Sequence, residues 1–277
     1  MPTELWLVRH GARLDYARPT WRKEIVSNGG DVRDPPLSPL GHRQARMVAE
    51  NYFLRLPEGA RPQRILVSPY LRVITTAAPT ADALGLALEL ELGLAETHFV
   101  PDRLPSAAQR FRYLPMVDPA SGGAASLIRP AATPGHYVEA LGMARQDHAE
   151  EGGGSMAVEA YPKEYLRRIK AFAPVLEAAI EGQRVSCFSH AASLSLVAAL
   201  LGSDLQTPGR FAPCGVFHLR KGDEEGAAWE LLQKAEDNSA YVTVQDEKTF
   251  PWTFELPEGA LPMDKQRESV HDMWKEL

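Results

Sequence analysis

Short runs of apolar residues recur along the chain, bounded by polar or turn residues, and this pattern predicts buried strands. The runs are Leu5–Val8, Ile65–Val67, Ala87–Leu90, Val185–Phe188 and Val216–Leu219. Longer segments with helical spacing lie between several of them. Strands that alternate with helices of this length predict an α/β fold, a three-layer sandwich in which helices cover both faces of a mainly parallel central sheet.

Apolar residues spaced three and four positions apart predict helices in the longer segments. These segments span residues 45–56, 71–81, 166–180 and 193–201. Ser38 followed by Pro39 is a good start for the first helix, because a hydroxyl can cap its N-terminus and proline fits its first turn. Pro79 predicts a kink or a break in the second helix, and Gly202 predicts the end of the fourth.

Two regions depart from this alternation. Residues 101–160 are rich in glycine and proline, with arginines among them. An insertion of this length is typical of a lid or a mobile loop. We therefore expect a single domain over residues 1–277 with an inserted cap at about 101–160, although a flexible, solvated insert fits the composition equally well. The region from Ala235 to the C-terminus carries Trp252, Phe254 and Trp274, which suggests a tail that packs on the body of the protein or on a partner.

The composition narrows the class of protein. The chain has 277 residues, a mass of 30.5 kDa and a net charge of −6, which argues against nucleic-acid binding because a phosphate backbone attracts a basic surface. Its longest apolar run, Leu196–Leu201, is too short to span a membrane.

Two features of the sequence suggest where the protein is located. Two cysteines favour a reducing compartment, and Met1 leads into the first predicted strand without a signal peptide. We expect a cytoplasmic protein, with the nucleus as the other option.

The first candidate for chemistry is the loop Arg9–Arg13, directly after the first predicted strand. In open α/β sheets, ligands bind beyond the carboxyl ends of the strands. Arg9 and Arg13 flank His10, and their forked donors suit the oxygens of a phosphate. The same charges disfavour a protonated imidazole, so His10 should be neutral and nucleophilic. Taken alone, a histidine after a strand is more often structural.

Further polar residues follow other predicted strands. His190 lies where a strand meets a helix, Arg72 lies in the first turn of the second predicted helix, and Glu96 follows a third strand. Each has an ordinary interpretation by itself: a capping or core histidine, a solvated arginine and a surface glutamate. Together with the first loop, they bring two histidines, three arginines and one carboxylate to the same end of the predicted sheet.

This combination resembles the histidine phosphatase superfamily, whose fold is also called phosphoglycerate-mutase-like. The resemblance covers roughly residues 4–100 and 159–256. It extends to a branch that contains the suppressor-of-T-cell-receptor-signalling phosphatases and a phosphatase-like subunit of a yeast RNA polymerase III transcription factor. The residues that resemble this branch are Asp34–Ser38, Gly41, Gln44–Ala45, Ser68–Pro69, Leu71–Arg72, Thr76–Ala77, Ser189–Ser193 and Trp229–Leu231.

The resemblance implies a metal-independent phosphomonoesterase that works through a phosphohistidine intermediate. His10 would attack phosphorus and Glu96 would act as general acid and base, with His190 as a third catalytic residue. The phosphate oxygens would be bound by Arg9, Arg13, Arg72 and His190. No cofactor is implied. The partner would be a small phosphorylated substrate or a phosphopeptide, neither nucleic acid nor a membrane is expected as a partner, and a homodimer is a further option.

Some residues depart from the patterns of related families. Ala12 and Ala191 replace a glutamate and a glycine that are frequent in the branch, but neither change removes a proposed phosphate ligand. Arg13 and Leu14–Asp15 occupy the places where glycolytic mutases carry Ser or Thr and then Asn, which disfavours mutase activity. Ala191 also replaces the acidic residue of acid phosphatases and phytases, which leaves Glu96 as the proton donor. The alternative is a catalytically weak, phosphatase-like scaffold or interaction subunit, suggested by the insert, the aromatic tail and the likeness to a transcription-factor subunit.

Overall fold

The computed structural model describes most of the chain outside the insert. The described residues are 1–27, 32, 34–97, 128–130, 162–224, 226–245, 251–254 and 264–277. The predicted cap at about 101–160 therefore lies outside the described residues, apart from one short strand. The division into a single domain with a cap stays a prediction.

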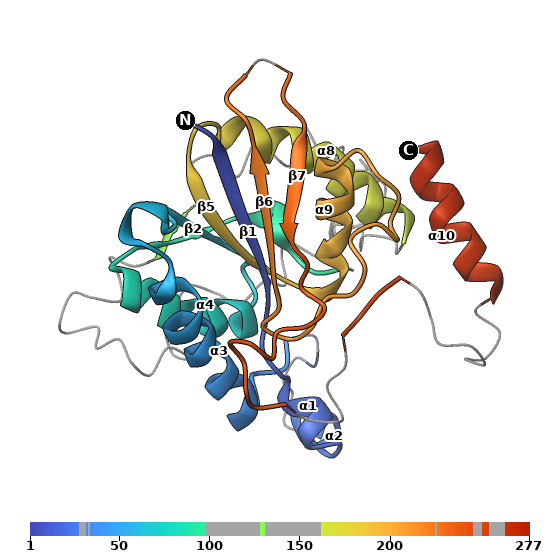
Figure 1. Cartoon of the computed structure of the whole chain (residues 1–277). Coiled ribbons are helices and arrows are strands. Elements are labelled where there is room, and N and C mark those ends of the chain that lie inside the picture. Colours follow the sequence, from blue (N-terminus) through green and yellow to red (C-terminus); the bar gives the residue numbers. More distant parts are fainter. Residues whose placement is uncertain are drawn as a thin grey trace, which may run out of the picture.

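The described residues form a sheet of seven strands in the order β4-β3-β2-β5-β1-β6-β7 (Figure 1). The strands are β1 (Thr3–Arg9), β2 (Arg64–Val67), β3 (Leu88–Leu90), β4 (Ile128–Pro130), β5 (Arg184–Ser189), β6 (Val216–Lys221) and β7 (Trp229–Gln233). The pairs from β4 to β1 are parallel, whereas β6 pairs antiparallel with both β1 and β7. The prediction of a mainly parallel sheet is confirmed, and the antiparallel β6–β7 pair at one edge makes the sheet mixed.

Helices surround the sheet. The α-helices are α1 (Leu14–Ala17), α2 (Trp21–Ser27), α3 (Pro39–Asn51), α4 (Leu71–Leu84), α8 (Lys163–Ala179), α9 (Leu194–Leu200) and α10 (Asp264–Glu276). Short 3₁₀ turns are η1 (Phe53–Arg55), η2 (Glu58–Ala60), η3 (Leu92–Leu94) and η6 (Ala191–Ser193). The helices predicted from apolar spacing are all present, although the first gives way to a 3₁₀ turn at its end and the fourth begins with one.

Local signals explain two of the helix ends. The hydroxyl of Ser38 accepts a hydrogen bond from the Gly41 N–H at 3.1 Å and caps α3, as predicted. The fourth helix ends beside Gly202, whose φ of 60° suits a residue without a side chain. Pro79 lies inside α4, but the helix continues to Leu84, so a break at this proline was a wrong prediction. Buried residues on either side of Pro79 hold the helix against the sheet, and this packing outweighs one missing hydrogen bond.

Two hydrophobic clusters lie on opposite faces of the sheet, so the layered architecture is confirmed. Successive side chains of a strand point to opposite faces. Leu5 and Leu7 of β1 therefore pack with α8 and α9, whereas Trp6 and Val8 pack with α3 and α4. Figure 1 shows the two helix pairs on either side of the sheet.

The described part of the C-terminal region packs on the body of the protein. Trp252 exchanges backbone hydrogen bonds with Phe211 at 2.8 and 3.0 Å. The indole N–H of Trp274, on α10, donates to the carbonyl of Ser203 at 2.9 Å. Since Phe254 and Trp274 are also buried, the first of the two predicted roles for this tail is confirmed.

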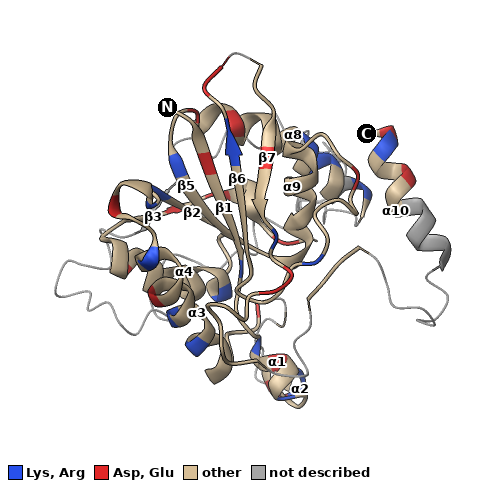
Figure 2. Ribbon diagram, in the orientation of Figure 1, with Lys and Arg blue, Asp and Glu red and all other residues tan. Residues whose placement is uncertain are grey.

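The described surface gives no sign of a membrane segment or of one dominant charge. Among the described residues, no helix is both long enough and apolar enough to cross a bilayer. Basic and acidic residues are interspersed over the described elements (Figure 2). The expected lack of nucleic-acid binding stays a prediction.

A close backbone contact fixes the loop after β1 against the N-terminus of α3. A Cβ atom on Gly41 would lie 2.2 Å from the carbonyl oxygen of Ala12, and one on Gly11 would lie 2.7 Å from the carbonyl oxygen of Gly41. Because both obstacles are backbone atoms, neither can move aside without shifting a secondary-structure element. Only glycine lets the loop that carries His10 approach α3 this closely.

We expect Gly41→Ala to destabilise the protein by about 1–3 kcal/mol, since overpacking displaces backbone. Urea unfolding followed by circular dichroism measures this free energy. Gly59→Ala is the matched control, because a methyl group there would meet nothing within 4 Å and its stability should be nearly unchanged. Equal stability of the two variants would contradict the close contact.

Candidate active site

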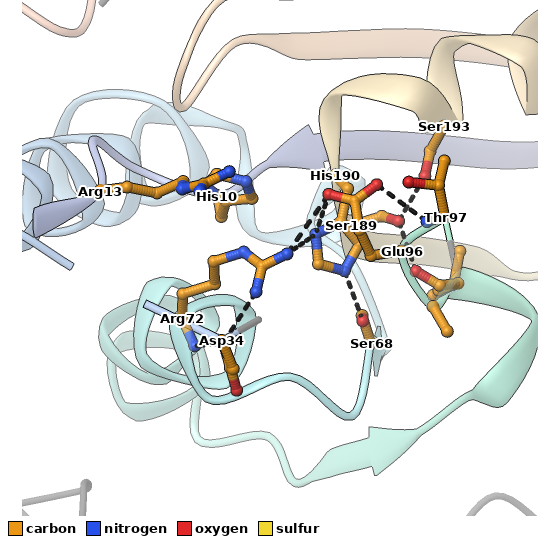
Figure 3. A network of polar contacts seen from close by, with 12 residues as sticks. His10, Arg13, Asp34, Ser68, Arg72, Glu96, Thr97, Ser189, His190 and Ser193 are labelled. Carbon is orange, nitrogen blue, oxygen red and sulfur yellow. Dashed lines mark hydrogen bonds and ion pairs between the residues drawn. The ribbon is translucent and has the colours of Figure 1, made fainter. Parts of the chain in front are cut away.

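The predicted site residues meet where three parallel strands end side by side. Arg9 of β1 pairs with Ser189 of β5, so His10 and His190 are the next residues of adjacent strands. Val67 of β2 pairs with Phe188, which brings the start of α4 to the same edge. The loop after β3 carries Glu96 to this edge. Figure 3 shows these side chains facing one another from separate elements.

His10 is oriented by its own loop. Its Nδ1 lies 2.8 Å from the carbonyl oxygen of Gly11, which can only accept a hydrogen bond. Nδ1 therefore carries the proton, and the lone pair is on Nε2. Burial and the neighbouring charges of Arg72, His190 and Arg9 hold the pKa of His10 well below its usual value. A neutral imidazole with a free lone pair on Nε2 is a competent nucleophile.

His190 lies against His10, with 5.5 Å between the ring centroids. Its Nδ1 is 3.0 Å from Nη2 of Arg72, and its Nε2 is 2.8 Å from Oγ of Ser68. Nδ1 thus lies between a donor, the Arg72 guanidinium, and an acceptor, a Glu96 carboxylate oxygen at 3.2 Å, while the Ser68 hydroxyl can donate to Nε2 or accept from it. Burial lowers the pKa of His190 to about 4, although Glu96 opposes the shift.

The guanidinium of Arg72 lies between two carboxylates. Nη1 donates to Asp34 at 2.8 Å, and Nη2 donates to Glu96 at 3.3 Å. The other oxygen of Asp34 accepts the Leu71 N–H at 2.6 Å, so the same carboxylate caps α4 and holds the arginine. The ring of Tyr70 packs under the guanidinium, 4.8 Å from its centroid. Because Arg72 is almost fully buried, these contacts fix both its position and its charge.

Glu96 is held ionised. One oxygen lies 3.2 Å from Nδ1 of His190 and 3.3 Å from Arg72, and the other accepts the Thr97 N–H at 3.0 Å. Although burial opposes ionisation, the attraction of His190 and then of Arg72 holds the pKa of this carboxyl well below its usual range. The carboxylate is therefore a proton acceptor in the pocket as it stands.

The two remaining arginines differ in their surroundings. Arg9 is buried, donates from Nη1 to the carbonyl of Phe211, and burial lowers its pKa to about 10. Arg13 forms a two-point ion pair with Asp15, at 3.0 and 2.7 Å, and lies over the ring of Tyr16. A phosphate ligand would thus share Arg13 with Asp15, and the role predicted for Arg13 stays a prediction.

A metal ion is one possible ligand of this site. Possible ligand atoms of His10, Glu96 and His190, one from each residue, lie within 4.8 Å of one another. However, Nη2 of Arg72 lies 3.0 and 3.3 Å from His190 and Glu96 of this set. Arg9 is also buried and its charge reaches Glu96, so two guanidinium cations already balance the carboxylates of Asp34 and Glu96. This surrounding favours an anion over a second cation.

Three residues that build the site had no role assigned from the sequence. Asp34 and Ser68 stood in the motifs of the family resemblance, but only tertiary structure shows that they hold Arg72 and His190. Arg168 of α8 is buried and donates to the carbonyls of Gly93, Ala95 and Glu96. A buried arginine in an amphipathic helix looks like a surface residue in the sequence, so no signal pointed to it.

The chain is similar to known proteins in sequence and in fold. The family model described as the histidine phosphatase superfamily (branch 1) matches residues 5–104. The structure of ecdysone phosphate phosphatase from Bombyx mori, in complex with tungstate, is similar with a TM-score of 0.53 and 18% identity over 95% of this chain and 99% of that chain. The resemblance to the histidine phosphatase superfamily is confirmed. The family model also supports the prediction of a phosphatase, the solved structure shows a shared fold, and the narrower branches named from the sequence stay predictions.

Two other solved structures are similar over most of the chain. Mycobacterial glucosyl-3-phosphoglycerate phosphatase with inorganic phosphate has a TM-score of 0.49 and 21% identity, over 88% of this chain and 100% of that chain. Entamoeba histolytica phosphoserine phosphatase with 3-phosphoglyceric acid has a TM-score of 0.49 and 16% identity, over 86% of this chain and 99% of that chain. No curated protein matches the chain in sequence.

We expect Asp34→Ala to reduce the free energy of unfolding by about 2–4 kcal/mol, because it removes a helix cap and a buried ion-pair partner together. Urea unfolding measures the change. Asp82→Ala, at an exposed position near the other end of α4, is the control and should have little effect. A loss as small as that of the control would show that Asp34 does not hold Arg72.

The pKa directions give a second prediction. His10 should stay neutral, and the signal of His190 should titrate near pH 4, because its pKa is lowered to about 4. Imidazole NMR signals, assigned by comparison with His10→Ala and His190→Ala, measure both. Titration of either ring at about pH 6.5, the value of a free imidazole, would contradict the charges assigned to the pocket.

Proposed function

We propose that the protein is a phosphomonoesterase that transfers the phosphoryl group of its substrate to His10 and then to water, without a metal ion. The observation that carries this proposal is the neutral His10, which has its lone pair on Nε2 and lies among the buried arginines Arg9 and Arg72. Such a site attracts a phosphate and offers it a nucleophile at the same time.

In the first step, Nε2 of His10 attacks phosphorus. The bond from phosphorus to the leaving oxygen breaks as the phosphorus–nitrogen bond forms, and a proton from Glu96 goes to the leaving oxygen. Arg9 and Arg72 bind the remaining oxygens, where negative charge spreads in the transition state. The hydrogen bond from His10 Nδ1 to Gly11 keeps the ring in line during the attack.

Glu96 needs a proton before it can give one. An entering phosphate places negative charge beside the carboxylate and takes up donors of Arg72 that Glu96 uses in the unliganded pocket. Both effects raise the pKa of Glu96, because they remove an attraction and add a repulsion. The substrate itself thus turns this carboxylate into a general acid.

In the second step, Glu96 removes a proton from water. The resulting hydroxide oxygen bonds to phosphorus, the phosphorus–nitrogen bond breaks, and inorganic phosphate leaves His10 in its starting state. Glu96 ends this step with the proton that it lost in the first, so the cycle closes. In this mechanism no metal ion is needed. The guanidinium of Arg72, beside His190, would stabilise the negative charge of the transition state, as a metal ion does in other phosphatases.

The substrate class follows from the same residues. Arginines and a nucleophile select the phosphate group, so we infer that the substrate is a phosphate monoester, either a small phosphorylated molecule or a phosphopeptide. The contacts of the pocket also weigh against the scaffold alternative, because His10, Glu96 and His190 all keep the hydrogen bonds that a reaction needs.

We expect the purified protein to hydrolyse phenyl phosphate, and His10→Ala to lower the rate by at least about 10³-fold, because the change removes the nucleophile. Glu96→Gln should lower it by about 10²–10⁴-fold through loss of acid–base catalysis. Release of inorganic phosphate measures both rates, and a chelator should leave the wild-type rate unchanged.

His42→Ala is the control for removal of an imidazole, because His42 lies on α3 outside the pocket, and this variant should keep its activity. The proposal also predicts an acid-labile phosphohistidine on His10 after rapid quenching. An inactive wild type, or undiminished activity of His10→Ala, would refute it.

A further inference from the structure

The loop that carries Glu96 is held by side chains from two other elements. Four successive carbonyls, from Gly93 to Glu96, accept hydrogen bonds from outside the loop. Ser189, at the end of β5, donates to the carbonyl of Leu94 at 2.7 Å. The other carbonyls accept from Arg168 on α8. The loop is thus tied to the strand that leads to His190 and to the helix behind it.

Arg168 supplies most of these bonds. Its Nη1 donates to Gly93 at 2.9 Å, and its Nη2 donates to Ala95 and Glu96, both at 3.2 Å. The side chain is 1% exposed and its guanidinium lies 5.0 Å from the ring centroid of Tyr165. A planar fork can serve several carbonyls from one fixed position, whereas an ammonium group is a single point of contact.

The loop also packs against α8, one turn beyond Arg168. A Cβ atom on Gly93 would lie 2.3 Å from the ring of Phe172. The loop backbone therefore rests directly on the ring, while Arg168 holds its carbonyls. Together these contacts determine where the backbone of Glu96 lies relative to His190.

We propose that Arg168 is a positioning residue, which holds the Glu96 backbone so that the carboxyl group faces the leaving oxygen of the substrate. The proposal rests on the proposed function, since it assigns Arg168 a part in the proton transfer by Glu96. Arg168 acts on the loop and not on the phosphate, because its hydrogen bonds to Gly93, Ala95 and Glu96 all end on backbone carbonyls.

The leaving group distinguishes this role from a general loss of structure. Phenolate is a poor leaving group and needs the proton of Glu96 as the phosphorus–oxygen bond breaks. 2,4-Dinitrophenolate is a good leaving group and departs without it. The ratio kcat/KM reports the steps up to this bond cleavage, so it is insensitive to the later hydrolysis of phosphohistidine. A misplaced Glu96 should therefore harm phenyl phosphate selectively.

The experiment compares kcat/KM for phenyl phosphate and 2,4-dinitrophenyl phosphate in wild type and Arg168→Met. We expect a loss of about 10²-fold for phenyl phosphate, the lower end of the range for general acid–base catalysis, and at most about threefold for the dinitrophenyl ester. Arg167→Met is the matched control, since the neighbouring arginine of α8 is exposed, and it should leave both values unchanged.

A double variant provides a readout that a purely structural role would not give. If Arg168 acts through Glu96, then adding Arg168→Met to Glu96→Gln should cause no further loss with phenyl phosphate. Arg168→Lys, which keeps the charge but not the fork, should show the same selective loss to a smaller extent. If Arg168→Met does not fold, this lysine variant decides the question.

Equal losses for the two esters, or additive losses in the double variant, would overturn the positioning role. An unchanged kcat/KM in Arg168→Met would overturn it as well. These outcomes are distinct from failure of the proposed function, which would appear as an inactive wild type or an active His10→Ala. Glu96→Gln, measured with both esters, should also lose activity mainly toward phenyl phosphate, which would show that the leaving-group contrast reports on Glu96.

Discussion

The site depends on one buried cation. The guanidinium of Arg72 is 1% exposed and contacts Asp34, Glu96 and His190. A buried charge is tolerated only where partners replace its hydration. Asp34 is fixed in this role because it also caps α4, whereas Glu96 comes from a loop and, in the proposed reaction, would exchange its place with a phosphate oxygen.

The charge of Arg72 affects the protonation of both reacting groups, His10 and Glu96. Burial lowers the pKa of His10, and Arg72 and Arg9 lower it further, whereas His190 and then Arg72 hold the pKa of Glu96 low. In the proposed reaction, a phosphate bound to the arginines would weaken their influence on Glu96 and so raise the pKa of this carboxyl. Glu96 would then be protonated beside a neutral His10, the states that a general acid and a nucleophile require.

Sequence patterns predicted the parts of the structure that local interactions determine. The five apolar runs became strands because their residues are buried or half-buried in the sheet, and Ser38 capped its helix because the cap needs only nearby atoms. The edge strands β4 and β7 escaped prediction: β7 alternates between more and less buried residues over only five positions. Pro79 did not break α4, because the packing of this helix against the sheet is a tertiary effect that the local sequence does not show.

The site residues show the same difference between local sequence signals and tertiary contacts. His10, Arg72, Glu96 and His190 were predicted because each follows a strand, and the ends of parallel strands meet. Asp34, Ser68 and Arg168 act through contacts between segments far apart in the chain, which no spacing in the sequence encodes. Their residue types are common at turns and on helix surfaces, so only the folded chain distinguishes them.

The most direct test of this account is a crystal structure of the protein with bound tungstate, a tetrahedral oxyanion. The account predicts the anion beside Nε2 of His10, with oxygens on Arg9, Arg72 and His190, and with Glu96 displaced from Arg72 but still next to the anion. An anion bound elsewhere, or a site in which Glu96 keeps Arg72 and excludes the anion from His10, would contradict it.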